Sequence, residues 1–171
     1  MKALFIIDMI KDFINPDGAL YCGDTSREII LFIQRKIAEF QRNNDLVVFI
    51  CDSHEEDDPE FRMFPKHSVA GTKGAEIIDE LPVKKKDIIV KKKRYSAFYG
   101  TNLDDVLQEN NISEVAVVGV CTSICVMDTI GDLRNRDYEV IVYKKGVADF
   151  DQKAHRFALE RMSNIYGAKV A

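Results

Sequence analysis

Runs of consecutive apolar residues alternate along the chain with segments in which apolar residues recur every three or four positions. A short continuous apolar run is typical of a strand that is covered on both faces, and the longer spacing is typical of an amphipathic helix. The pattern predicts five strands, at residues 3–7, 46–51, 88–90, 115–118 and 139–143. It predicts helices at residues 25–43, 101–108, 122–136 and 151–163.

The order of these elements predicts the fold class. Strands that are almost entirely apolar and alternate with helices indicate a parallel sheet with right-handed crossovers. We therefore expect an α/β fold, a three-layer, Rossmann-like parallel sheet with helices on both faces, and a single domain over residues 1–171. Residues 167–171 are a candidate edge strand. Thr25 and Glu28 have the spacing of a capping box at the start of the first long helix.

Residue types capable of chemistry follow the predicted strands directly. Asp8 follows the first strand, Asp52 and His54 follow the second, and Lys92 follows the third, while the stretch GVCTSICV at 119–126 follows the fourth. In an open α/β sheet, ligands bind beyond the carboxyl ends of the strands. The long irregular stretch at residues 52–73 starts at the same edge, and a compact domain rarely keeps so long a loop without a use.

Composition and charge narrow the class of function. The net charge of −4 argues against a nucleic-acid binder, because phosphate binding needs a basic face. The first apolar stretch is short and is interrupted by Asp8, so we expect neither a signal peptide nor a membrane span. We therefore expect a cytoplasmic protein whose cysteines are thiols.

The two cysteines of GVCTSICV leave several interpretations open. Cys125 falls in the first turn of a predicted helix, where backbone N–H groups favour a thiolate and can hold an oxyanion. A small buried apolar residue is an equally good interpretation of Cys125, and a better one of Cys22, Cys51 and Cys121. One C-x3-C spacing lacks the second ligand pair of a zinc site. Asp8 is a candidate base for a Cys125 nucleophile.

Several stretches together resemble the isochorismatase-like cysteine hydrolases, and within them the nicotinamidase/pyrazinamidase group. The matching stretches are FIIDMIKDF, DGAL, CDSH, FPKHSVAGTKGAEI, KKRYSAFYGTNLDDVL and GVCTSICV. The resemblance implies the isochorismatase-like hydrolase fold. It also implies a catalytic triad of Asp8, Lys92 and Cys125, with Lys92 selected from a run of three lysines by its distance from Tyr95. The oxyanion hole is expected at Val120, Cys121 and Cys125, with a cis peptide between Val120 and Cys121.

The resemblance also implies a metal site and a substrate pocket. The D-x-H pattern and a later histidine correspond to Asp52, His54 and His67, with Glu60 as a further direct or water-mediated ligand. Two imidazoles and a carboxylate suit one divalent ion, Zn²⁺ first, with Fe²⁺ or Mn²⁺ as alternatives. The predicted pocket walls for a flat ring are Phe13, Leu20, Phe64 and Tyr95, where Phe64 replaces the tryptophan common in the group.

The implied activity is hydrolysis of nicotinamide to nicotinate and ammonia, a step of NAD salvage, with pyrazinamide as a further substrate. The expected partner is a small-molecule amide, with no nucleic acid and no membrane, and the expected assembly is a homo-oligomer. One alternative is a related cysteine amidase that acts on a carbamoyl or ureido group. The others are a catalytically silent binding module and a thiol redox protein that uses Cys121 and Cys125.

Overall fold

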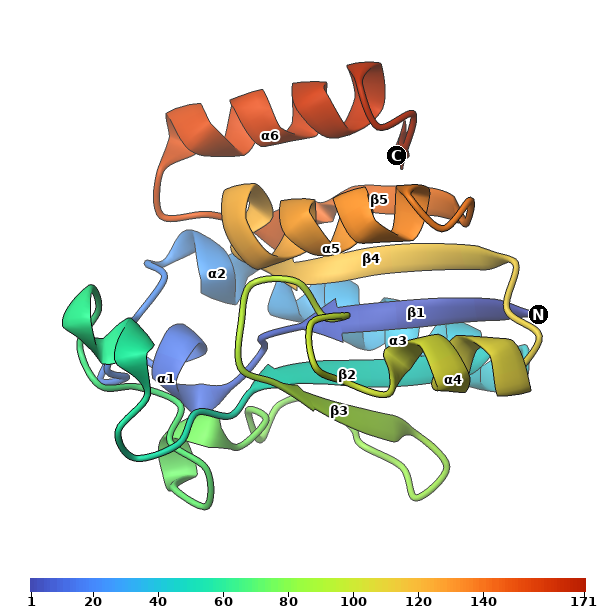
Figure 1. Ribbon diagram of the computed structural model, residues 1–171. Helices are drawn as coiled ribbons and strands as arrows, with labels where there is room; N and C mark the ends of the chain where they lie inside the picture. The colour runs from blue at the N-terminus through green and yellow to red at the C-terminus, as the bar shows by residue number, and fades with distance from the viewer.

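A six-stranded parallel sheet forms the centre of the protein in a computed structural model that describes residues 1–171 (Figure 1). The strand order is β3-β2-β1-β4-β5-β6, and every neighbouring pair is parallel. The strands are β1 (Lys2–Ile7), β2 (Leu46–Asp52), β3 (Ile88–Lys92), β4 (Glu114–Val120), β5 (Glu139–Ala148) and β6 (Lys169–Val170). The order reverses between β1 and β4, which places a topological switch point there.

Helices cover both faces of the sheet. Figure 1 shows α3 behind the strands and α4 and α5 in front of them. The helices are α1 (Lys11–Ile14), α2 (Thr25–Glu28), α3 (Ile30–Arg42), α4 (Leu103–Glu109), α5 (Met127–Arg134) and α6 (Gln152–Asn164). The short helical turns are η1 (Pro59–Arg62), η2 (Lys73–Ala75) and the π-helical turn η3 (Thr122–Val126). No helix is both long enough and apolar enough to cross a bilayer.

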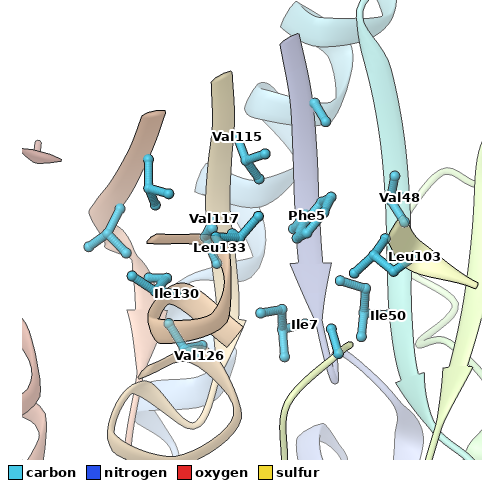
Figure 2. Packing of buried hydrophobic residues seen from close by; sticks show 14 of the residues in the cluster. Phe5, Ile7, Val48, Ile50, Leu103, Val115, Val117, Val126, Ile130 and Leu133 are labelled. Carbon is cyan, nitrogen blue, oxygen red and sulfur yellow. The ribbon is translucent and has the colours of Figure 1, made fainter. Parts of the chain in front are cut away.

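The two helical layers enclose two separate hydrophobic cores. Alternate residues of β1 point to opposite faces, so Phe5 joins the core under α4, α5 and α6, while Ile6 joins the core under α3. Figure 2 shows Phe5 beside Val48, Leu103 and Val117 in the first of these cores. Burial on both faces explains why the strands read as continuous apolar runs.

The predicted fold class is confirmed, and the strands at 139–143 and 88–90 extend further than predicted, to Ala148 and Lys92. The predicted helix at 25–43 is divided into α2 and α3 at Ile29, and the predicted cap is wrong. Thr25 lies inside α2, and its hydroxyl donates to the carbonyl of Asp149 at 3.1 Å. The Thr25 hydroxyl therefore makes a tertiary contact in place of a cap.

The segment after β4 also differs from the plain helix that the spacing predicts. Residues 122–126 form a π-helical turn before α5 begins at Met127. Such turns inside or before α-helices occur frequently at functional sites. Because Cys125 lies within this turn, its backbone environment is not that of a regular first helical turn.

Candidate active site

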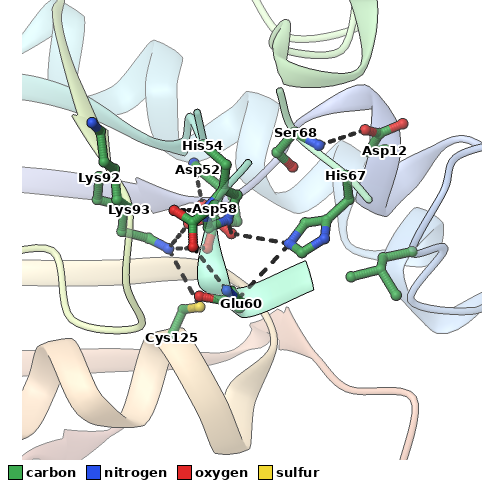
Figure 3. A network of polar contacts seen from close by, with 12 residues as sticks. Asp12, Asp52, His54, Asp58, Glu60, His67, Ser68, Lys92, Lys93 and Cys125 are labelled. Carbon is green, nitrogen blue, oxygen red and sulfur yellow. Dashed lines mark hydrogen bonds and ion pairs between the residues drawn. The ribbon is translucent and has the colours of Figure 1, made fainter. Parts of the chain in front are cut away.

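The carboxyl ends of four adjacent strands bring four reactive side chains together. Asp8 follows β1, Asp52 ends β2, Lys92 ends β3, and Cys125 lies in the turn after β4. These strands are neighbours in the order β3-β2-β1-β4, so residues far apart in sequence meet at one edge of the sheet. Figure 3 shows Lys92, Asp52 and Cys125 pointing toward one another at this edge.

The backbone around Asp8 is held by its neighbours in an uncommon conformation. Asp8 has a φ of 53°, in the left-handed region that non-glycine residues rarely adopt. Its N–H donates to the carbonyl of Ile50 at 2.8 Å. Gly119 of β4 has a φ of 117°, and a Cβ there would lie 2.0 Å from the carbonyl oxygen of Ile7. Only glycine therefore allows β4 to approach β1 this closely beside Asp8.

Lys92 is a fully buried cation in contact with two carboxylates and a thiol. Its Nζ lies 2.9 Å from Asp8 Oδ2 and 3.5 Å from Cys125 Sγ, and it also forms an ion pair with Asp52. The lysine side chain is completely enclosed. The backbone N–H of Asp52 donates to Asp8 Oδ1 at 2.9 Å, which fixes the orientation of the Asp8 carboxylate.

Burial and these contacts shift the pKa values of all four side chains in the cluster. Burial, together with repulsion from Asp52, raises the pKa of Asp8 to about 6 despite the attraction of Lys92. Burial opposes the charge on Lys92, but the carboxylates of Asp52 and Asp8 outweigh it and raise the pKa of Lys92. Burial raises the pKa of Cys125, against the attraction of Lys92. An acid with a pKa near neutrality beside a thiol is suited to exchange a proton with it.

The turn that carries Cys125 is held by the C-terminal part of the chain. The Val120–Cys121 peptide is cis, where the sequence resemblance predicts it. Ser123 donates both its N–H and its hydroxyl to the buried carboxylate of Asp149, each at 2.8 Å. Nδ1 of His155 lies 2.9 Å from Oγ1 of Thr122. Three polar contacts thus hold the residues between Cys121 and Cys125 in place.

Two histidines and Asp52 form a group suited to a metal ion. The ligand atoms of Asp52, His54 and His67 all lie within 4.8 Å of one another, and all three residues are buried. His67 Nδ1 lies 2.7 Å from the carbonyl of Pro65, and His54 Nδ1 lies 3.1 Å from Asp58 Oδ2. Both rings can donate through Nδ1 to these oxygens, which leaves the Nε2 lone pairs free.

The buried Nε2 of His54 supports this interpretation directly. It has no hydrogen-bond partner and lies 3.5 Å from Asp52 Oδ2. A buried polar atom without a partner is costly, and an ion at this point would satisfy it. Nε2 of His67 lies 4.0 Å from both Asp52 Oδ2 and Glu60 Oε1. The residues present therefore fit a divalent cation, with Glu60 beside the three principal candidates.

A mostly apolar cavity of about 250 Å³ opens beside this cluster. All four residues predicted as walls line it, together with Asp52, Glu60, His67 and Cys125. Its size suits a ligand smaller than a typical drug. It is lined by no lysine or arginine, and its charged residues Asp52 and Glu60 are acidic. The cavity therefore favours a small, neutral, flat ligand.

Several residues of the site escaped the sequence prediction. Asp58 orients His54 and in turn pairs with Arg94 Nη1 at 3.0 Å. Its position four residues after His54 was the only sequence signal for it. The cavity walls also include residues that carry no sign of this role in the sequence, namely Tyr21, Cys22, Ile124 and Phe150.

The chain matches the family model described as the isochorismatase domain over residues 2–171. PncA of Bacillus subtilis, which bears the name of an uncharacterized isochorismatase family protein, is 42% identical over 99% of this chain and 98% of its own. A crystal structure of nicotinamidase/pyrazinamidase PncA from the same species has a TM-score of 0.94 at 39% identity, covering 99% of this chain and 98% of that chain.

Two further solved structures are similar to this chain. N-carbamoylsarcosine amidase from Thermoplasma acidophilum has a TM-score of 0.90 at 36% identity, covering 99% of this chain and 94% of that chain. A pyrazinamidase of Pyrococcus horikoshii in complex with zinc has a TM-score of 0.93 at 30% identity, covering 99% of this chain and 98% of that chain. Amide hydrolysis is common to the names of these neighbours.

Proposed function

Because the chain belongs to the isochorismatase family and is a hydrolase of amide bonds, we propose that it is a metal-dependent nicotinamidase. It converts nicotinamide to nicotinate and ammonia through a thioester, and pyrazinamide is a further substrate of the same geometry. The observation that carries this proposal is the position of Cys125 and of the Asp52–His54–His67 group beside one apolar cavity. Cys125, Asp52 and His67 line that cavity.

The proposed metal site provides a binding partner for the ring nitrogen of the substrate. Asp52, His54 and His67 would hold the ion, with Glu60 as a direct or outer ligand, and Zn²⁺ is the first candidate because it prefers imidazole and carboxylate ligands. When bound, the ion supplies a Lewis acid that anchors the pyridine nitrogen. A similar pyrazinamidase solved with zinc supports the choice of metal.

The triad accounts for cleavage of the carboxamide. Asp8 takes the proton of the Cys125 thiol, and the thiolate attacks the carbonyl carbon to form a C–S bond. The backbone N–H groups of Cys121 and Cys125 stabilise the oxyanion. Asp8 then gives the proton to the leaving nitrogen, ammonia departs, and water cleaves the thioester to nicotinate. Lys92 stays cationic and stabilises both the Asp8 carboxylate and the thiolate.

The second candidate is an amidase for N-carbamoyl amino acids, which the similarity to N-carbamoylsarcosine amidase favours. Such substrates carry a carboxylate, whereas the cavity lining has no lysine or arginine and includes two acidic residues. Lys92 does not line the cavity and is already paired with Asp8 and Asp52. A neutral heteroaromatic amide fits this charge distribution better.

Ammonia release distinguishes these candidates. The zinc-loaded protein is assayed with nicotinamide, pyrazinamide and N-carbamoylsarcosine, with a chelated sample and Cys125→Ala beside it. We expect ammonia from the two heteroaromatic amides, loss of release on chelation, and none from Cys125→Ala, which still binds one zinc ion. Release from N-carbamoylsarcosine alone would replace nicotinamide with the second candidate. Turnover by Cys125→Ala would refute the thioester mechanism.

A further inference from the structure

Two thiols that the proposed mechanism does not use are in direct contact in the cavity wall. Cys22 Sγ lies 3.2 Å from Cys121 Sγ, although the residues are 99 positions apart in the sequence. Both cysteines are free, and both are nearly buried, with exposed fractions of 4% and 8%. Cys22 belongs to the segment at residues 15–24, between α1 and α2, and Cys121 precedes the turn that carries Cys125.

We propose that Cys22 and Cys121 are a modification site, at which a peroxide joins them in a disulfide that fastens the 15–24 segment to the nucleophile turn. The two sulfur atoms need to approach by little more than 1 Å to reach the disulfide length of about 2.05 Å. The fold has thus already brought together two segments that a random chain would rarely bring into contact.

The cavity gives a small oxidant access to both sulfurs. Cys22 and Cys121 line the same cavity as Cys125, together with Leu20 and Ile124. Contact with Cys22, together with burial, raises the pKa of Cys121, which disfavours the Cys121 thiolate as the first attacking group. The Cys22 sulfur attacks one peroxide oxygen to form an S–O bond, the O–O bond breaks, and the leaving hydroxide takes the Cys22 thiol proton to form water, which leaves a sulfenic acid on Cys22. The Cys121 sulfur then displaces hydroxide from that sulfenic acid, a second water forms, and the S–S bond closes.

The disulfide would alter the site because both partners border the reacting groups. Shortening the sulfur–sulfur distance draws the 15–24 segment, which carries the walls Leu20, Tyr21 and Cys22, toward the turn between Cys121 and Cys125. Displacements of about 1 Å near reacting groups can reduce turnover by as much as a hundredfold. We expect the oxidised protein to lose activity at least about tenfold, and a thiol reductant to restore it.

Chemical mapping tests the modification independently of any activity. Cys125→Ala retains three of the four cysteines, so oxidation at the peroxide-sensitive nucleophile cannot interfere. After mild hydrogen peroxide, we expect one titratable thiol, Cys51, and a non-reduced peptide that joins Cys22 to Cys121. In the same Cys125→Ala background, Cys22→Ser should leave the thiols of Cys51 and Cys121 unjoined. The matched control Cys51→Ser should still form the bond between Cys22 and Cys121. Three free thiols after oxidation, or a bond that involves Cys51, would overturn the proposal.

The effect on catalysis rests on the proposed function and is measured separately. Wild type and Cys22→Ser receive the same peroxide dose, and ammonia release from nicotinamide is followed before and after addition of dithiothreitol. We expect a larger reversible loss in wild type. Equal losses in both proteins would assign inactivation to Cys125 and remove the regulatory role. Absence of activity before oxidation would count against the proposed function, but it would not affect the evidence for the disulfide from peptide mapping.

Discussion

Lys92→Met tests the charge arrangement of the site most directly. In the wild type, one buried cation lies against the carboxylates of Asp8 and Asp52. Methionine has a similar length but no charge, so the substitution leaves two neighbouring carboxylates buried without a counter-ion. Removing one partner of a buried ion pair costs about 3–5 kcal/mol. The proposed base and nucleophile also lose their cationic partner, so activity should fall with stability.

The expected change in melting temperature follows from chain length. At about 2.1 cal/mol/K per residue, a chain of 171 residues has an unfolding entropy of about 0.36 kcal/mol/K. A loss of about 3–5 kcal/mol therefore lowers the midpoint by about 8–14 °C. The measurement is calorimetric or circular-dichroism melting at pH 7.5 in the presence of a chelator, which removes any ion that could neutralise Asp52.

Lys93→Met is the matched control. Lys93 is the adjacent residue, but its ion pair with Glu55 is exposed, with 52% and 64% of the two side chains accessible. An exposed pair contributes about 0–1 kcal/mol, so this variant should melt within about 3 °C of the wild type and retain activity. A Lys92→Met protein that melts as high as the Lys93→Met control would refute the reasoning. Equal loss of activity in both variants would refute the choice of Lys92.

The other predictions concern the base, the metal ligands and the nucleophile turn. The folded-state pKa of Asp8, about 6, exceeds the ordinary value of 3.8, so its contribution to stability is complete below pH 4 and is lost as pH rises through 6. In chelated protein, denaturant titrations should therefore show Asp8→Asn gaining about 2 kcal/mol relative to wild type between pH 4 and pH 7, and a constant difference would contradict the pKa. Asp58→Asn should weaken zinc binding about 10- to 100-fold in competition with a chromogenic chelator, because Asp58 orients His54, and an unchanged affinity would exclude that role. Asp149→Ala should slow alkylation of Cys125 by iodoacetamide and lower kcat more than KM changes, because Ser123 loses both of its bonds to that carboxylate; a change in KM alone would argue against it.

The sequence predicted the residues whose positions follow from strand ends. Asp8, Asp52 and Lys92 stand directly after or at the end of buried strands, and a parallel sheet necessarily brings such ends to one edge. His67 was predicted from the resemblance alone, because its place beside His54 depends on the course of a long loop. The predicted cavity walls likewise came from the resemblance, and all of them line the cavity.

The remaining features depend on contacts between distant segments, which no local pattern records. The helix division at Ile29 accompanies a bond from Thr25 to Asp149, 124 residues later. Cys22 reaches the cavity only because its segment folds back onto the turn at Cys121. In the sequence, an apolar residue that lines a cavity cannot be distinguished from one that fills the core.

The placement of the reactive groups on four neighbouring strands makes catalysis depend on pairing between distant parts of the chain. The β1–β4 pairing joins Lys2 to Glu114, segments that lie more than 100 residues apart, and Asp8 meets Cys125 only through it. Pairings of such long sequence separation form slowly, because the closure entropy of the intervening chain must be overcome first. Recovery of activity during refolding should therefore lag behind the recovery of helical signal. The return of turnover would then mark the time at which β1 and β4 pair during refolding.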